Sequence, residues 1–194
     1  MTTKIRRWIE TDTGHRVPNH KSKCRNIHGH RYRWEVELEG TTVTAKGTSD
    51  EGMLMDFSDV KSILMEYIHD VVDHAFLVYE GDKEVIDALA MIENQKIVEL
   101  PFIPTAENLA KWAYYTVEPH IKSAYENQIR VRCFHVRSQS RRTCLDTTSP
   151  QKHLTIRSSR ARIFWPTSFG TGMSTLSRTL RAWSIASSLL IPLT

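Results

Sequence analysis

Hydrophobic and polar residues alternate most regularly between residues 31 and 39. Charged residues in this stretch are interleaved with Tyr32, Trp34, Val36 and Leu38. A period of two residues is typical of an antiparallel strand that buries one face and exposes the other. A shorter run, Lys4 to Glu10, predicts a strand before it.

Two later segments have the spacing of amphipathic helices. The first begins near Ser58 and ends near Val72, with Asp56 as a candidate N-cap. Its apolar positions are Val60, Ile63, Leu64, Tyr67, Ile68 and Val71. The second follows Thr105, an N-cap residue, and is expected to end by Pro119.

The remaining elements are shorter. A helix over 85–92 and an extended piece over 96–102 are expected, and a third strand runs from Ile129 to Val136. The order strand, strand, helix, helix, strand predicts an α+β domain over residues 1–136.

Residues 137–194 differ from this domain in composition. From residue 136 onward the chain has nine Lys or Arg, one acidic residue (Asp146), and 20 Ser or Thr in 59 residues, without sustained periodicity. We interpret 137–194 as a basic, poorly ordered tail whose composition is typical of translation in a shifted reading frame. Resequencing the gene near codon 137 tests that hypothesis.

Composition limits the partners and the compartment. The tail's arginines lack the interleaved aromatic residues typical of nucleic-acid binding, and its apolar end, 182–193, is shorter than a membrane span of roughly 20 residues. We therefore expect no nucleic-acid or membrane partner. An odd count of three cysteines and the absence of an apolar run near Met1 predict a cytoplasmic protein without a signal peptide.

A histidine pair carries the candidate chemistry. His28 and His30 are two residues apart, so in a strand both rings project from one face. His15 ends the preceding extended run, and a hairpin would bring it close. Three imidazoles with one open position are typical of catalytic zinc. Single histidines are more often surface or core residues, and Cys24 is an alternative ligand.

Asp73 and His74 follow the end of the first helix. There the Asp73 carboxylate can orient the His74 imidazole and stabilise its protonated form. Glu107 falls in the first turn of the second helix, where the helix dipole alone favours an acidic residue.

Five motifs in order, between residues 14 and 109, resemble the 6-pyruvoyl- and 6-carboxy-tetrahydropterin synthase family. These motifs are Gly14-His15-Arg16, Cys24-x-x-x-His28-Gly29-His30, Gly52-Met53-x-x-Asp56-Phe57, Asp73-His74-x-x-Leu77 and Pro104-Thr105-Ala106-Glu107-Asn108-Leu109. The resemblance implies the tunnelling fold, a four-stranded antiparallel sheet with two helices on one face, and a homo-oligomer, commonly a hexamer.

The same resemblance assigns roles to individual residues. It implies Zn²⁺ on His15, His28 and His30, Cys24 as proton acceptor, and Asp73 with His74 as acid and base. In relatives Thr105 and Glu107 contact the pterin across a subunit interface, although helix capping alone would explain both residues.

The resemblance also implies the substrate, 7,8-dihydroneopterin triphosphate. Three residues between Cys24 and His28 are similar to the bacterial 6-carboxy branch, which releases acetaldehyde and triphosphate and feeds queuosine and related 7-deazaguanine synthesis. The 6-pyruvoyl branch is the alternative.

The chain departs from the family after Val136. Family members carry a pterin-anchoring glutamate and a Tyr-containing final strand, and this chain has neither. We expect the final strand to be lost or altered, which leaves a catalytically impaired zinc- or pterin-binding homologue as a further alternative.

Overall fold

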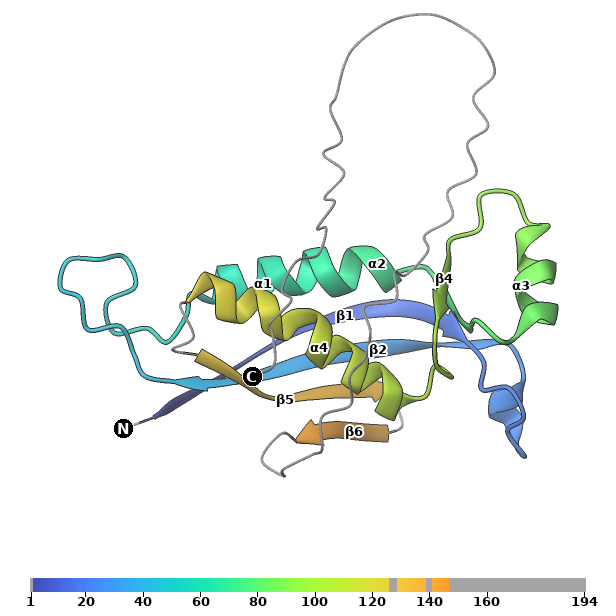
Figure 1. The fold of residues 1–194 in the computed structure, drawn as a ribbon, viewed down its shortest axis with the longest axis horizontal. Helices are drawn as coiled ribbons and strands as arrows, with labels where there is room; N and C mark the ends of the chain where they lie inside the picture. Colours follow the sequence, from blue (N-terminus) through green and yellow to red (C-terminus); the bar gives the residue numbers. More distant parts are fainter. Residues whose placement is uncertain (1, 126–128, 139–140, 147–194) are drawn as a thin grey trace, which may run out of the picture.

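Two long strands dominate the fold in the computed structural model, which describes residues 2–125, 129–138 and 141–146 (Figure 1). Strands β1 (Thr3–His15) and β2 (His28–Gly40) pair antiparallel along their whole length. The register sets His15 opposite His28. Both strands are confirmed, and β1 extends five residues beyond the predicted Glu10, as far as His15.

The described strands form one mixed, open sheet in the order β4-β3-β1-β2-β5-β6. Strands β5 (Ile129–Ser138) and β6 (Arg141–Asp146) continue the antiparallel pairing from β2. Strands β3 (Phe76–Tyr79) and β4 (Ile97–Leu100) add parallel pairing on the side of β1. The α+β class is confirmed. The expected four antiparallel strands are present, but they are not the whole sheet.

Of the two outcomes expected for the last strand, lost or altered, the structure shows the second, because β6 is present with a sequence that departs from the family pattern. β6 pairs with β5 over six residue pairs, from Cys133–Asp146 to Ser138–Arg141. Ladder hydrogen bonds join backbone groups, so an altered side-chain sequence does not prevent pairing. The domain boundary expected after residue 136 falls inside β5, and residues 147–194 of the expected tail lie outside the described residues.

The helices begin at the predicted caps. Helix α1 (Phe57–Leu64) starts where Asp56 Oδ1 accepts a hydrogen bond of 2.7 Å from the Ser58 N–H, and it continues through a π-helical segment, η2 (Met65–His69), into α2 (Asp70–Val72). Helix α4 (Ala106–Ala124) starts where Thr105 Oγ1 accepts from the Asn108 N–H. Helix α3 (Lys83–Ala90) connects β3 to β4.

The expected end of the second helix at Pro119 is wrong, because α4 continues through Pro119 to Ala124. A proline inside a helix costs about 3 kcal/mol. Val117 and Ile121, on either side of it, are fully buried in the core. Burial of each such side chain contributes about 1.5–3 kcal/mol, enough to offset the proline.

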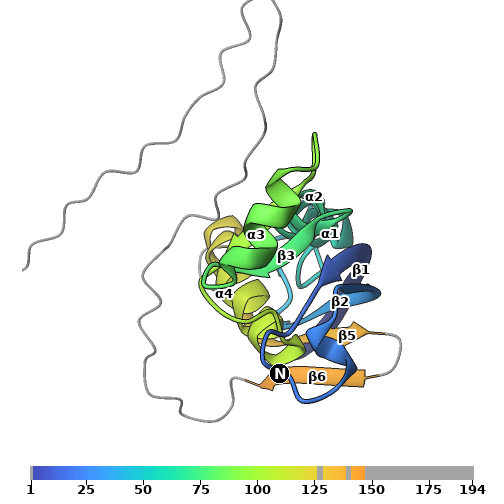
Figure 2. The ribbon, with the colours of Figure 1, turned by 90° about the vertical axis from the view of Figure 1, so that its right-hand side faces the viewer.

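The two faces of the sheet differ in chemistry. Helices α1 and α4 pack against each other and cover one face (Figure 2), burying Trp34, Val36 and Leu38 completely. The opposite face carries carboxylates such as Glu37, which pairs with Arg6 and Arg132. Among the described residues, no helix combines the length and apolar character needed to cross a membrane.

Candidate metal centre

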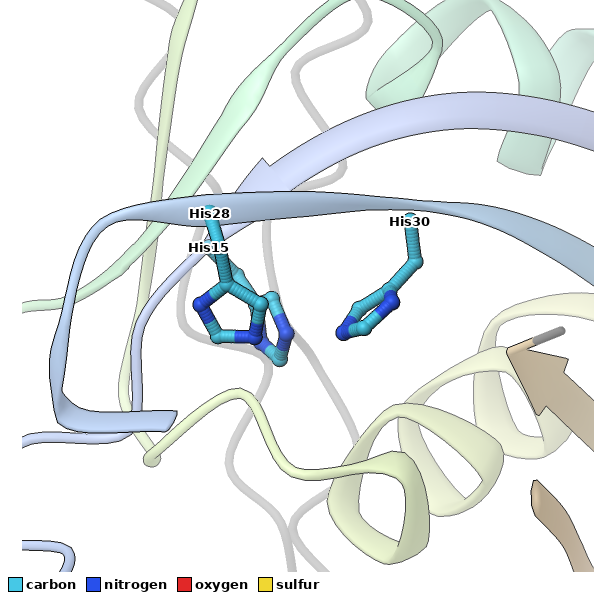
Figure 3. A group of neighbouring side chains, drawn as sticks. All are labelled: His15, His28 and His30. Atoms are coloured by element: carbon cyan, nitrogen blue, oxygen red, sulfur yellow. The ribbon is translucent and has the colours of Figure 1, made fainter. Parts of the chain in front are cut away.

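Three imidazoles converge where β1 ends and β2 begins. Figure 3 shows His15, His28 and His30 turned toward a common point. Their ring centroids are 4.5 Å (His15–His28), 4.8 Å (His28–His30) and 5.2 Å (His15–His30) apart. The predicted grouping follows from the register, because His15 lies opposite His28 and the strand pleat puts His30 on the same face.

Backbone carbonyls orient two of the rings. The Nδ1 atom of His15 lies 2.8 Å from the Pro104 oxygen, and that of His28 lies 2.8 Å from the Asn26 oxygen. A carbonyl only accepts, so in both rings Nδ1–H is the donor and Nε2 keeps its lone pair. Metal-binding histidines are commonly held in this way.

The site favours neutral imidazoles. Burial, reinforced by the neighbouring histidines, lowers the pKa of His15 to about 4, although the hydrogen bond with Pro104 opposes this shift. Burial and the nearby His28 also lower the pKa of His30. Neutral imidazole is the form that binds a metal, so these rings are ready ligands at neutral pH.

The donor set fits a metal ion. The three ligand nitrogens lie within 4.8 Å of one another, and no other residue of the described chain joins this group. Tetrahedral coordination with metal–nitrogen bonds of about 2.1 Å sets such atoms about 3.4 Å apart. Small side-chain rotations toward the common point would therefore complete the site, with a coordination position left for water or substrate.

Tyr32 is a site residue that the sequence analysis did not assign. Its hydroxyl donates to His15 Nε2 over 3.1 Å, and its side chain is buried. Burial and the nearby Cys24 raise the pKa of Tyr32 above its ordinary value, so its hydroxyl remains a donor at neutral pH. The signal was present in the sequence, because Tyr32 is two residues after His30 and shares its face.

Replacement of Tyr32 by phenylalanine is expected to tighten metal binding by about two- to 13-fold. The hydroxyl competes with the metal for the lone pair of His15 Nε2, and a net hydrogen bond of about 0.5–1.5 kcal/mol corresponds to that range. Competition with a chromophoric chelator measures the affinity. An unchanged or weaker affinity would contradict this role for Tyr32.

Cys24 lies beside the cluster without joining it. It sits in a short 3₁₀ helix, η1 (Lys23–Arg25), and its carbonyl accepts a hydrogen bond of 2.8 Å from the Val17 N–H. The thiol is half-buried and lies near enough to Tyr32 to contribute to the raised pKa of that hydroxyl. It does not belong to the group of ligand atoms, so the geometry favours a role next to the metal over ligation.

Asp73 and His74 form the predicted pair but face away from the imidazoles. His74 Nδ1 donates to Asp73 Oδ2 over 2.8 Å, and Asp73 Oδ1 accepts from the Asp12 N–H. His74 lines a recess of about 500 Å³ beside Gly29 and Arg31. Gly29 and Arg31 alternate with His28 and His30 along β2, so their part of the recess lies on the opposite face of the sheet, and the recess also reaches His30.

The charge state of this pair is defined by its contacts. Burial raises the pKa of Asp73, but the hydrogen bonds from His74 and the Asp12 N–H outweigh it and hold the pKa below its usual value. Asp73 is therefore a carboxylate at neutral pH, and it fixes the His74 tautomer with the proton on Nδ1.

The start of α4 lies next to the metal centre. The Pro104 carbonyl that orients His15 immediately precedes Thr105, whose side chain caps the helix. Glu107 follows in the first helical turn. The structure thus accounts for Thr105 by capping, and this residue directly follows the carbonyl that orients His15.

Comparison with known proteins decides the family. The sequence profile described as 6-pyruvoyl tetrahydropterin synthase matches residues 4–145. The chain belongs to this family. It is 38% identical over 107 residues to the 6-carboxy-5,6,7,8-tetrahydropterin synthase of Rickettsia bellii, covering 55% of this chain and 74% of that protein.

Solved structures support the fold. An uncharacterised protein of Wolinella succinogenes, WS1659, superposes with a TM-score of 0.59 at 19% identity, covering 76% of this chain and 99% of the other. The 6-pyruvoyl tetrahydropterin synthase of Caenorhabditis elegans superposes with a TM-score of 0.51 at 20% identity, covering 75% and 96%. The family resemblance and the tunnelling-type α+β fold are confirmed, and the chain is a lyase of the pterin-synthase type.

Proposed function

We propose that this protein uses Zn²⁺ to convert 7,8-dihydroneopterin triphosphate to 6-carboxy-5,6,7,8-tetrahydropterin, with release of acetaldehyde and triphosphate. The observation that carries the proposal is the convergence of three imidazoles, two of them fixed by backbone carbonyls. The names of the bacterial relatives support the 6-carboxy product. A reaction in the cytoplasm, serving queuosine or another 7-deazaguanine product, would agree with this activity.

His15, His28 and His30 would hold the metal. Borderline nitrogen donors in a three-ligand set suit zinc better than the hard cations Mg²⁺ and Ca²⁺, which prefer oxygen. When bound, zinc polarises substrate oxygens and stabilises the negative charge that develops as a neighbouring C–H proton leaves.

Cys24 would take that proton. Cys24 lies close enough to Tyr32 to contribute to the raised pKa of that hydroxyl. The Tyr32 hydroxyl in turn contacts His15. The thiolate is the form of a cysteine that accepts a proton. The half-buried position keeps it accessible to a substrate bound over the imidazoles.

His74 would exchange a proton on the other side of the substrate. Asp73 holds the proton on Nδ1, so Nε2 is available as acceptor and, once charged, as donor. The side chain is 78% exposed and lies on the sheet face opposite the imidazoles. In the described residues His74 makes no hydrogen bond or ring contact with the three imidazoles of its own chain, and we infer that His74 serves the centre of another subunit.

The sheet edges support a homo-oligomer, a hexamer by family resemblance. β1 pairs with β3 at Gly14 and His15, so its second edge is open along most of its length in the described chain. β6 forms the other edge of the antiparallel half. Two open edges of one sheet can join between copies, which would satisfy their backbone groups and assemble shared sites.

Thr105 and Glu107 would bind the pterin in such an interface. Their position beside Pro104 puts them near the metal centre, and the carboxylate of Glu107 can accept two hydrogen bonds from the amino and ring N–H groups of a pterin. This contact would be the more important here because the anchoring glutamate of the family is missing from the sequence.

Product analysis tests the proposal. Zinc-loaded protein incubated with 7,8-dihydroneopterin triphosphate is expected to release acetaldehyde and triphosphate in equal amounts. Triphosphate without acetaldehyde would overturn the 6-carboxy assignment in favour of the 6-pyruvoyl reaction, which the family profile and the C. elegans structure keep as the second candidate. Release of neither product, with zinc bound, would indicate a non-catalytic homologue.

A further inference from the structure

The turn that carries His74 has an unusual backbone conformation. Asp73 ends α2 with φ −65° and ψ 131°, and His74 then adopts a φ of +54°, in the left-handed region that favours glycine. A histidine persists there when surrounding contacts fix the turn. The direction of its imidazole therefore depends on whatever holds the two flanking peptide groups.

Lys96 reaches this turn from a distant part of the chain. Its ammonium group donates to the Asp73 carbonyl over 2.8 Å and to the Asp70 carbonyl over 3.0 Å. These are C-terminal carbonyls of a helix, which lack intrahelical partners and attract cations. Lys96 itself is fixed, because its own carbonyl accepts a hydrogen bond of 2.9 Å from the Phe76 N–H, at the start of β3.

Other contacts hold different atoms of the same turn. The Asp12 N–H binds the Asp73 carboxylate over 3.0 Å, the Asp12 carbonyl accepts from the His74 N–H, and His69 Nε2 lies 3.7 Å from that carboxylate. Asp12 and His69 thus fix the Asp73 carboxylate, and Asp12 also fixes the His74 amide. The carbonyl of the same Asp73–His74 peptide is held by Lys96, so Lys96 and the Asp12 carbonyl together fix the plane of the peptide that precedes the left-handed residue.

We propose that Lys96 is a positioning residue for His74. Lys96 lies between α3 and β4, and its ammonium group reaches the end of α2. This contact holds the His74 imidazole in the direction that its proton exchange requires. Lys96 touches neither the metal centre nor the recess. The inference rests on the proposed function, because it assigns Lys96 a task in that proton exchange.

Replacement of Lys96 by methionine tests the proposal in the full-length, zinc-loaded protein. Methionine keeps the apolar stem and removes the donors. We expect kcat to fall about 10- to 100-fold, the range for a misplaced catalytic group, while KM and zinc content stay the same. The variant Lys96→Arg, which keeps a cationic donor, should recover part of the loss. Lys122→Met, which breaks the surface pair with Glu118, is the matched control and should leave kcat unchanged.

A double variant separates positioning from general stability. In a His74→Ala background, Lys96→Met should cause little further loss of kcat, because the group that it positions is gone. An additional full loss in that background would overturn the proposal, as would an unchanged kcat in the single variant.

A readout without turnover separates this inference from the proposed function. Diethylpyrocarbonate modifies unprotonated imidazoles, and mass spectrometry locates the product. The rate at His74 should change several-fold in Lys96→Met and remain at the wild-type rate in Lys122→Met. If wild-type protein turns over no substrate but the His74 rate shifts as described, the proposed function fails and the positioning contact stands. An unchanged rate overturns the contact itself.

Discussion

His28→Ala is expected to reduce zinc affinity roughly 100- to 1000-fold and to abolish turnover at stoichiometric zinc. Four-ligand zinc sites bind with about 10–16 kcal/mol, so each ligand contributes about 2.5–4 kcal/mol. His28 is a suitable target because Asn26 orients its ring at the start of β2, away from the buried core. Metal content after dialysis, measured by mass spectrometry, and zinc titration give the result.

The matched control is His20→Ala. His20 lies in the loop between β1 and β2, outside the group of convergent ligand atoms, so its variant should keep zinc and activity. Chelation of the wild-type protein followed by zinc addition should remove and restore turnover. Wild-type zinc content in His28→Ala would exclude the three-imidazole centre.

The metal centre could be predicted from sequence because it depends on strand periodicity. His28 and His30 share a face whenever the segment is extended, and a two-stranded connection brings His15 opposite His28. Tyr32 lies on the same face for the same reason. The alternation of charged and apolar residues in this segment predicted both the strand and its buried face. A period of two residues is local information, so it survives without knowledge of the tertiary structure.

The direction of His74 could not be predicted in the same way. It depends on a left-handed residue, on a carboxylate held by the Asp12 N–H, and on a lysine 22 positions later in the chain. Each of these is a long-range contact or a backbone conformation that histidine rarely adopts. Strand β3 was missed for a related reason, because a four-residue strand carries too little periodicity to identify, whereas β4 falls inside the extended piece expected over 96–102.

The strand β6 and the path of α4 show a different limit. Side-chain composition after Val136 suggested that the last strand was lost or altered, and backbone pairing with β5 forms it with an altered sequence. Pro119 suggested a helix end, yet the buried residues around it carry α4 onward. In both cases tertiary packing outweighs a local preference, and the energy of that packing is not visible in a single segment.

Cys24→Ala is expected to lower kcat about 100- to 10,000-fold, the usual contribution of a general base, with zinc content unchanged. The thiol contributes no ligand atom to the cluster, so its loss should leave the imidazoles in place. Cys133→Ala is the control, since that thiol lies on β5 on the sheet face away from the helices, beside His135. Loss of zinc from Cys24→Ala would show that the cysteine is a ligand and not a neighbouring base.

Mixing two inactive variants distinguishes a shared site from one within a single chain. Cys24→Ala and His74→Ala chains, unfolded together in equal amounts and refolded, would form mixed oligomers. Suppose that Cys24 of one subunit works with His74 of another. Half of the sites then have an intact cysteine, and half of those also have an intact histidine. About a quarter of wild-type activity should therefore return. If both residues act within one chain, every site lacks one of them and no activity returns. The second outcome would require the Asp73–His74 turn to move toward the imidazoles of its own chain. That movement would break the contacts that Asp12 and Lys96 make with the turn.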